Sequence, residues 1–294
     1  MLWGTAIYAS VELMAVGLLR RRGIPSMAHF VSTAADRRAG GMAQHLLKGA
    51  LLKAYAGYLP VGIRQLDYLL SLGVASEQCF VVGNPVDNLA FGGVESGSLP
   101  EGLEHGRYFL YVGRFAPEKN LSLLLRAYRR HASAMEHPWP LVLVGSGPSE
   151  ASLRDEAAAS EGAGHVVFLP FTEGQALSRL YGAAGCFVLP SLSEPWGLVV
   201  NEATAAGLPV ILSDRCGCLP HLLREPENGW SFDPRDEDAL VRYLARASSA
   251  DLDREAVASV SRRLASGQTV ERYAELVARG CHTTLERWAR KGSA

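Results

Sequence analysis

The sequence predicts an α/β protein built around buried parallel sheets. From residue 108 onward, short apolar runs alternate with amphipathic helical stretches. The runs are almost continuously hydrophobic, as expected for strands that helices cover on both faces of a parallel sheet. At 294 residues the chain is long enough for two domains, each with its own core.

The regular part of the pattern defines one domain. We expect strands at 108–113, 140–145, 165–169, 185–190 and 208–212, with a weaker one at 229–232. Helical patterns lie between them near 120–136, 150–160, 173–184, 197–206 and 237–248. This alternation is typical of a doubly wound Rossmann-like domain.

The first 90 residues carry the same alternation more weakly. The expected elements are a helix near 10–22, a strand at 25–31, a helix near 41–56 and strands near 58–62 and 79–83. Because this is about half of such a domain, we expect an incomplete N-terminal sheet. The segment GNPVDN and the Gly- and Ser-rich residues 92–98 indicate a linker. The predicted parts are therefore an N-terminal domain at 1–91, a second domain at 92–267 and a helix at 268–294 that packs back on the first.

Composition and the N-terminus restrict the class of protein. The apolar start is interrupted by Glu12 and precedes its basic run, so it is interpreted as a buried helix and not as a signal peptide or membrane span. Five scattered cysteines argue against a disulfide framework and suggest a cytoplasmic protein. A net charge of −1 gives no electrostatic reason to expect nucleic acid as a partner.

Charged residues and glycines follow several of the expected strands. Arg114 and Lys119 come after 108–113, a Gly-Ser-Gly-Pro turn begins at Gly145, and Glu194 follows 185–190, with Glu202 further along. Ligands of open α/β sheets bind outside the carboxyl ends of the strands, so these loops should converge. Cations suit a diphosphate and carboxylates suit vicinal hydroxyls, which together indicate a nucleotide-sugar site.

Seven motifs between about residues 80 and 248 resemble glycosyltransferase family 4, whose members are retaining enzymes with the GT-B fold of two facing Rossmann-like domains. The motifs are NPVD, GRFAPEK, VGSGP, FLPF, PS-x-x-EPWGLVVNEA, GLPVI and NGWSFDPRD. The resemblance implies transfer of a sugar from a nucleoside diphosphate sugar to an acceptor hydroxyl with the anomeric configuration kept. The first strand and glycine loop of the family's N-terminal domain have no counterpart in this sequence.

The resemblance also implies roles for particular residues. Arg114 and Lys119 would hold the diphosphate, Glu194 the sugar hydroxyls, and Glu202 the ribose hydroxyls. Backbone near Leu169 would lie against the base. The implied donor-binding set is Gly113, Arg114, Lys119, Gly145, Leu169, Glu194, Trp196, Gly197, Leu198 and Glu202, and the implied catalytic set is Arg114, Lys119, Glu194 and His29.

Other interpretations stay open. The two cations also fit solvated charges at the start of a helix, Glu194 fits a helix N-terminus, and Glu202 fits a surface position. The residues after Glu202 indicate a largely buried helix, in which an unpaired carboxylate is costly. The same donor site would also serve a sugar-nucleotide epimerase or hydrolase, or a non-catalytic donor-binding fragment or subunit that another chain completes.

No metal or cofactor is expected besides the nucleotide-sugar substrate. Cys216, Cys218 and His221 lack a fourth ligand nearby. The Asp-x-Asp pairs at 236–238 and 251–253 stand where helices are expected to begin, so they are interpreted as structural. The acceptor is an unidentified saccharide, lipid-linked compound or small molecule. Peripheral membrane contact through residues 46–59 and self-association through an incomplete sheet edge are left open.

Overall fold

The computed structural model describes residues 6–34, 48–93, 98–159 and 164–292, with side chains in the first helix described from Met14 onward. The chain forms two compact units. One comprises Pro85–Thr269, and the other joins Met1–Asn84 to Val270–Ala294. The domain boundaries expected at 91/92 and 267/268 stay predictions.

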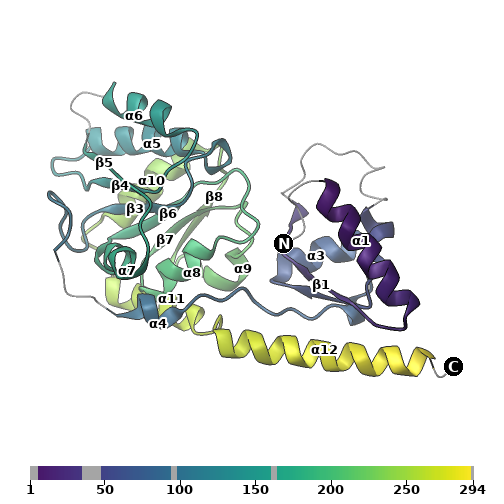
Figure 1. The fold of residues 1–294 in the computed structure, drawn as a ribbon. Helices are drawn as coiled ribbons and strands as arrows, with labels where there is room; N and C mark the ends of the chain where they lie inside the picture. The colour runs from purple at the N-terminus through teal and green to yellow at the C-terminus, as the bar shows by residue number, and fades with distance from the viewer. Residues whose placement is uncertain (1–5, 35–47, 94–97, 160–163, 293–294) are drawn as a thin grey trace. The chain divides into compact units, whose positions relative to one another are not determined.

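The larger unit is built on a six-stranded parallel sheet with the order β5-β4-β3-β6-β7-β8 (Figure 1). The expected α/β class with parallel sheets is confirmed, and every expected strand of this sheet is present, including the weak run at 229–232. The strands are β3 (Phe109–Val112), β4 (Leu141–Val144), β5 (Val166–Leu169), β6 (Cys186–Leu189), β7 (Val210–Ser213) and β8 (Gly229–Phe232). The strand order reverses between β3 and β6, which pair directly.

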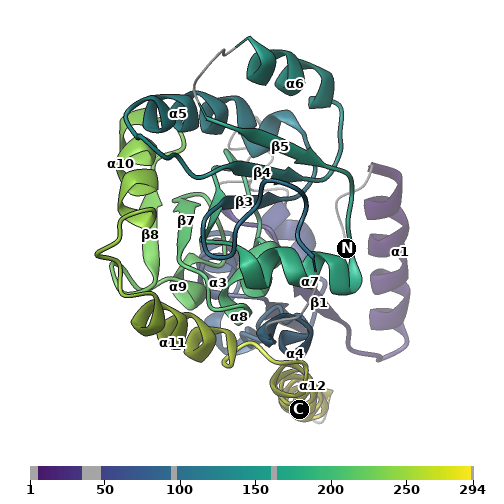
Figure 2. The same cartoon turned by 90° about the vertical axis from the view of Figure 1, so that its left-hand side faces the viewer.

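Helices cover both faces of this sheet (Figure 2). On one face α5 (Leu121–Ser133) contacts α6 (Glu150–Ala158) and α10 (Glu237–Ala247). On the other, α8 (Leu198–Ala205) contacts α11 (Arg254–Ala265) and the short helices α4 (Asn88–Gly92) and α9 (Leu219–Leu222), and α7 (Gly174–Ala183) contacts α4. Helix α4 was not predicted, and of α11 only the start, at the acidic pair 251–253, was expected. In particular, α4 occupies part of the expected linker, and the Asp87 side chain caps its first turn by accepting from the amide of Leu89.

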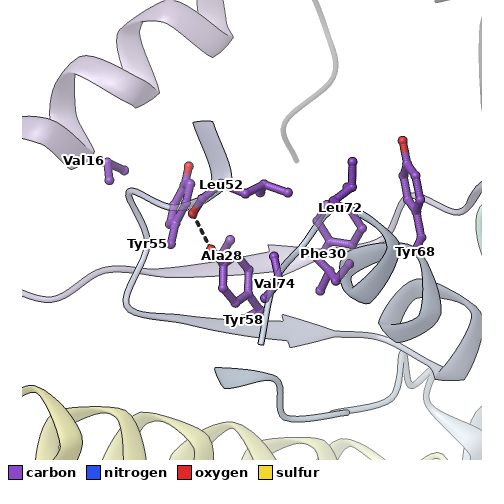
Figure 3. Close-up of a cluster of buried hydrophobic side chains, with 10 residues drawn as sticks. Val16, Ala28, Phe30, Leu52, Tyr55, Tyr58, Tyr68, Leu72 and Val74 are labelled. Carbon is purple, nitrogen blue, oxygen red and sulfur yellow. Dashed lines mark hydrogen bonds between the residues drawn. The ribbon is translucent and has the colours of Figure 1, made fainter. Parts of the chain in front are cut away.

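The smaller unit contains the parallel pair β1 (Met27–Phe30) and β2 (Gly57–Pro60), together with α1 (Ala6–Arg21), α3 (Ile63–Ser71) and α12 (Val270–Gly292). Its core is a cluster of apolar side chains that includes Phe30, Tyr58 and Leu72 (Figure 3). The Tyr58 hydroxyl donates to the Leu52 carbonyl inside this cluster. Helix α12 contacts β2, so the last helix belongs to this unit in space although it is distant in sequence.

Several expectations for the smaller unit need correction. The expected strand at 79–83 has only an isolated bridge between Cys79 and Tyr58, although the amide of Phe80 still donates to the Tyr58 carbonyl. Residues 63–71, which form α3, were not predicted to be helical. Of the helix expected at 41–56, residues 41–47 lie outside the described part, and the helix ends at residue 52.

The expectation of a buried first helix is also wrong over its described side chains. Met14 and Leu18 are 67% and 52% exposed, and of the described side chains in α1 only Val16 is buried. A single stripe of the helix therefore contacts the core. No helix in the described ranges is both long and apolar enough to span a bilayer.

Candidate functional site

The candidate site lies at the carboxyl ends of β3 and β6, the two strands between which the order of the sheet reverses. Arg114 and Lys119 lie in the segment between β3 and α5, and Glu194 lies in the loop between β6 and α8. Side chains from these two segments can meet because the strands are hydrogen-bonded neighbours. This is where ligands bind in open α/β sheets.

Lys119 and Glu194 form an ion pair, with Lys119 Nζ 2.5 Å from Glu194 Oε2. Their side chains are 20% and 11% exposed, so the pair is partly shielded from solvent. Arg114 is exposed, and none of the ion pairs within the described ranges includes it. The structure thus joins two of the predicted donor-binding side chains and leaves Arg114 at the surface.

Backbone hydrogen bonds fix the loop that carries Glu194. The amide of Leu192 donates to the Glu118 carbonyl (2.8 Å), and the amide of Gly217 donates to the Glu194 carbonyl (2.9 Å). Cys216 forms a bridge with Glu194, and the amide of Cys218 donates to the carbonyl of the site residue Trp196. The two cysteines are buried and hold this loop through their backbone. Over the described ranges, no group of three His, Cys, Asp or Glu side chains is arranged to hold a metal ion.

The glycines of the site let neighbouring loops approach each other closely. Gly113 and Gly145 have φ values of 151° and 139°. A Cβ at Gly145 would lie 2.1 Å from the Gly113 carbonyl oxygen, and one at Gly147 would lie 2.3 Å from that of Phe115. The expectation was that this turn lets backbone approach a ligand. What the structure shows is that the space of the missing side chains is filled by the adjoining loop.

Glu202 lies on α8 in a partly buried position. Its Oε2 is buried and has no hydrogen-bond partner within the described part of the chain. Burial raises the pKa of this carboxyl above its usual value, and the neighbouring Tyr181 hydroxyl offsets part of that rise. A buried carboxylate oxygen without a donor is costly, and it is suited to accept hydrogen bonds from a ligand.

The start of α8 is fixed by the turn at Trp196 and Gly197. Trp196 is 2% exposed, and its Nε1 donates to Asn201 Oδ1 at 2.8 Å. Gly197 caps the helix with φ 99°, a conformation that favours glycine. Leu198 is half-exposed. The indole of Trp196 thus stabilises the turn from within, and only its backbone is left as a candidate for ligand contact.

The remaining predicted residues, Leu169 and His29, belong to other strands. Leu169 ends β5, and its carbonyl accepts from the Gly145 amide (3.0 Å), while the nearby Phe171 is 72% exposed. His29 is on β1 in the smaller unit, with its ring 6.2 Å from that of Tyr273. Burial lowers the pKa of His29, and its Nε2 has no partner among the described residues.

Two residues of this site were not predicted. Asn120 donates to carbonyls on two other loops, and an Asn just before a helix was the available signal. Tyr111, in β3, donates through its hydroxyl to the Arg114 carbonyl at 3.0 Å. Burial, with a smaller effect from the Glu194 carboxylate, raises the pKa of Tyr111. Nothing in an apolar strand sequence distinguishes such a tyrosine from a core residue.

The acidic pairs that resemble metal motifs stand at helix starts, as expected. Asp236 Oδ1 accepts from the Ala239 amide at 2.8 Å, and Asp253 Oδ1 accepts from the Ala256 amide at 3.0 Å. Asp238 pairs with Arg130 at 2.8 Å. These carboxylates therefore cap or link helices.

The chain is similar to known glycosyltransferases in sequence and in structure. It is 34% identical over 143 residues to an uncharacterised glycosyltransferase of Methanocaldococcus jannaschii, and 32% identical over 149 residues to an O-antigen chain mannosyltransferase B of Escherichia coli. These matches cover 49% and 50% of this chain but only 36% and 38% of the relatives, so the chain spans little more than a third of their length.

A crystal structure of Anabaena HepE in complex with UDP superposes with a TM-score of 0.78 and 18% identity, covering 95% of this chain and 77% of that one. That likeness supports the expected GT-B fold class and, at this identity, nothing finer. Residues 101–263, which lie within the larger unit, match the family described as Glycosyl transferases group 1. Because this match covers more than half of the 294 residues, the chain belongs to the group 1 glycosyl transferases.

Proposed function

We propose that this protein transfers a sugar from a nucleoside diphosphate sugar to an acceptor hydroxyl and keeps the anomeric configuration, as in glycosyltransferase family 4. The observation that carries the proposal is the arrangement at one sheet edge. A cation and a carboxylate are paired there, and α8 supplies a second carboxylate with an unpartnered buried oxygen. A diphosphate would supply an anionic partner for the cation, and two sets of vicinal hydroxyls would donate hydrogen bonds to the two carboxylates.

In this proposal Lys119 and Arg114 hold the diphosphate. Glu194 accepts from the hydroxyls of the transferred sugar, and Glu202 accepts from the ribose hydroxyls. Backbone amides from Trp196 to Leu198, at the start of α8, lie near the sugar and phosphate, since the first amides of a helix have no partner within it. The remaining donor contacts, at Gly113, Gly145 and Leu169, are made through backbone. His29 stays a catalytic candidate on the family resemblance alone.

The chemistry exchanges one bond at the anomeric carbon. The bond from this carbon to the diphosphate oxygen breaks, and the acceptor oxygen bonds to the same face. The acceptor proton passes to the departing diphosphate oxygen. Lys119 and Arg114 stabilise the negative charge that develops on the diphosphate, and one such preorganised donor is worth about 10²–10³ in rate. We propose that these cations take the place of a divalent metal and that the free state of all five cysteines reflects a cytoplasmic location.

Nucleotide binding tests the proposal first. The melting temperature should be measured with UDP, GDP, ADP and dTDP and with their sugar derivatives, because a ligand that binds the folded state raises it. UDP is tried first, since the Anabaena structure was determined with it. We expect one nucleoside diphosphate to raise the melting temperature in the native chain but not in the double variant Arg114→Ala/Lys119→Ala. Equal shifts in both proteins would rule out this site.

The product then identifies the reaction. Incubation of the bound donor with candidate acceptors should give a glycoside with the donor's anomeric configuration, visible in the proton coupling at the anomeric carbon. An epimerised donor, or free sugar released equally with and without acceptor, would instead indicate the epimerase or hydrolase. Binding without any turnover would indicate a donor-binding subunit.

A further inference from the structure

Asn120 is the residue between Lys119 and the first residue of α5, and its backbone is unusual. It has φ 58° and ψ 36°, and in the described part of the chain it is the only non-glycine residue with positive φ. Asparagine is among the few side chains that tolerate this left-handed conformation. Although Asn120 is at the N-cap position, its side chain makes no capping hydrogen bond to α5.

The Asn120 amide group instead joins three loops. Its Nδ2 donates to the carbonyl of Pro190 at 3.2 Å and to that of Pro234 at 2.8 Å. Pro190 begins the loop that carries Glu194, and Pro234 lies between β8 and α10. Both acceptors are carbonyl oxygens, so the bonds require an NH₂ group at this position.

Lys119 is therefore held from both sides. On its C-terminal side Asn120 binds Pro190, and on its N-terminal side the Glu118 carbonyl accepts from the Leu192 amide at 2.8 Å. Both bonds run from the segment of Lys119 to the loop of Glu194. The ion pair between Lys119 and Glu194, at 2.5 Å, joins the same two segments as these two hydrogen bonds.

We propose that Asn120 is a positioning residue that acts through Lys119. It keeps the Lys119 ammonium beside the Glu194 carboxylate, where it receives the donor diphosphate. This inference rests on the proposed function. A long lysine side chain reaches a defined point only if the backbone that carries it is fixed, and the binding of an anion improves when that geometry exists in advance.

Substitutions can separate the side chain from the backbone conformation. Asn120→Gly keeps the left-handed backbone and removes the amide. Asn120→Asp keeps size and shape but replaces the donor with a carboxylate that cannot donate. The chain offers a matched control in Asn88, whose Nδ2 likewise donates to two carbonyls, those of Ala265 (2.9 Å) and Gln268 (3.3 Å), neither of which belongs to the candidate site. Asn88→Asp removes the same kind of bonds.

The first measurement is the Kd of the nucleoside diphosphate that binds best, determined by calorimetry well below each melting temperature. We expect Asn120→Gly and Asn120→Asp to weaken binding about tenfold and Asn88→Asp to change it less than twofold, although all three lower the melting temperature. In a Lys119→Ala background, Asn120→Gly should weaken binding less than twofold, because residues that act through one another are not additive. An unchanged Kd for Asn120→Gly, or an equal loss of affinity with and without Lys119, would overturn the inference.

A second measurement needs no nucleotide. Trace acetylation followed by mass spectrometry gives the reactivity of the Lys119 amine relative to that of the exposed Lys53. We expect Asn120→Gly, but not Asn88→Asp, to raise this ratio severalfold, since a Lys119 amine released from Glu194 is more accessible to the reagent. An unchanged ratio contradicts the positioning role. A raised ratio in a chain that binds no nucleoside diphosphate would support the positioning and reject the proposed function.

Discussion

Lys119 and Glu194 are 75 residues apart in sequence, yet the Lys119 ammonium lies 2.5 Å from a Glu194 carboxylate oxygen. The ligand-free site therefore satisfies its cation internally. In the proposed function a donor diphosphate has to compete with Glu194 for Lys119, while the hydroxyls of the transferred sugar offer Glu194 new donors. A complete nucleotide sugar would then give both Lys119 and Glu194 a new partner for the interaction they lose. A bare nucleoside diphosphate would give a new partner only to Lys119.

Glu194→Gln should strengthen binding of the bare nucleoside diphosphate and slow sugar transfer. The freed ammonium gains about twofold to tenfold in affinity for the diphosphate, the range for a partly exposed ion pair. Turnover should fall about tenfold to a hundredfold, because hydrogen bonds from the sugar to a charged group are lost. Calorimetry with both ligands and a transfer assay measure the two effects.

Glu118→Gln is the matched control for this prediction. Glu118 is an exposed carboxylate next to Lys119, and it contacts the Glu194 loop through its carbonyl, which the substitution leaves intact. It makes the same change in net charge without touching the pair. If both variants raised the affinity equally, the effect would be general electrostatics and not release of Lys119.

Arg114→Ala and Lys119→Ala should both weaken donor binding but should differ in stability. Each loses about 1.5–3 kcal/mol of charge-assisted bonding to the diphosphate. Arg114 is exposed and makes no described ion pair, so its removal should leave the melting temperature almost unchanged. Lys119→Ala leaves the partly buried Glu194 without its partner and should lower the melting temperature by several degrees.

Arg107→Ala serves as the surface control for both variants. Arg107 is exposed, precedes β3 at the opposite end of that strand from Arg114, and pairs only weakly with Glu104 at 3.6 Å. We expect neither the donor Kd nor the melting temperature to change measurably. A loss of affinity in this variant would mean that donor binding depends on the net charge of the protein and not on these two side chains.

The main sheet could be predicted from sequence because its strands are buried on both faces. All four residues of β3 and of β7 are buried, so their sequences are unbroken hydrophobic runs. Helix α11 could not be predicted in this way. Its buried positions are Val257, Ser261 and Ala265, and Ser261 is there because its hydroxyl donates to the Leu208 carbonyl at 2.8 Å. A buried stripe of small and polar residues gives little hydrophobic periodicity.

The edge that holds the site could be predicted, but the contacts within it could not. The alternation of strands and helices places Lys119 and Glu194 after the ends of buried strands, and the family resemblance assigns the two residues to different parts of the donor. Their pairing depends on side-chain reach between two loops. The hydrogen bonds from Asn120 to the carbonyls of Pro190 and Pro234 depend on a single residue in the left-handed conformation. Neither feature changes the hydrophobic pattern on which such an interpretation rests.

Transfer should continue in the presence of EDTA. We expect this because, in the proposed site, Arg114 and Lys119 supply the positive charge at the diphosphate, and because the acidic pairs at Asp236 and Asp253 cap helices. The assay compares turnover in EDTA with turnover in added magnesium or manganese. Activity that disappeared in EDTA and returned with either metal would show that a cation takes part.

Glu202→Gln should stabilise the ligand-free protein at neutral pH. Burial raises the pKa of Glu202 in the folded state, so the ionised form is less favourable there than in the unfolded chain. The native chain then loses stability as pH rises from the usual carboxyl range through the raised pKa. Melting temperatures measured from pH 4 to 8 should coincide at the acidic end and separate above it, with the variant higher. Equal melting temperatures of the two proteins at every pH would mean that burial does not destabilise the ionised Glu202 carboxylate.

Donor affinity should rise with pH over the same range and then level off, because in the proposed site the ribose hydroxyls donate to the ionised form of Glu202. Binding stabilises that form, so the pKa of Glu202 falls in the complex, and the affinity gained with pH is lost again as pH drops through the raised pKa of the free protein. The ligand should be a nucleotide sugar, whose diphosphate is esterified at both ends and does not titrate in this range. Calorimetry should give a flat profile for Glu202→Gln and a shallower one for a 2′-deoxyribose donor, which has one hydroxyl fewer. A native profile as flat as that of the variant would remove Glu202 from the ribose site, since no other contact proposed for the donor requires this carboxylate to be ionised.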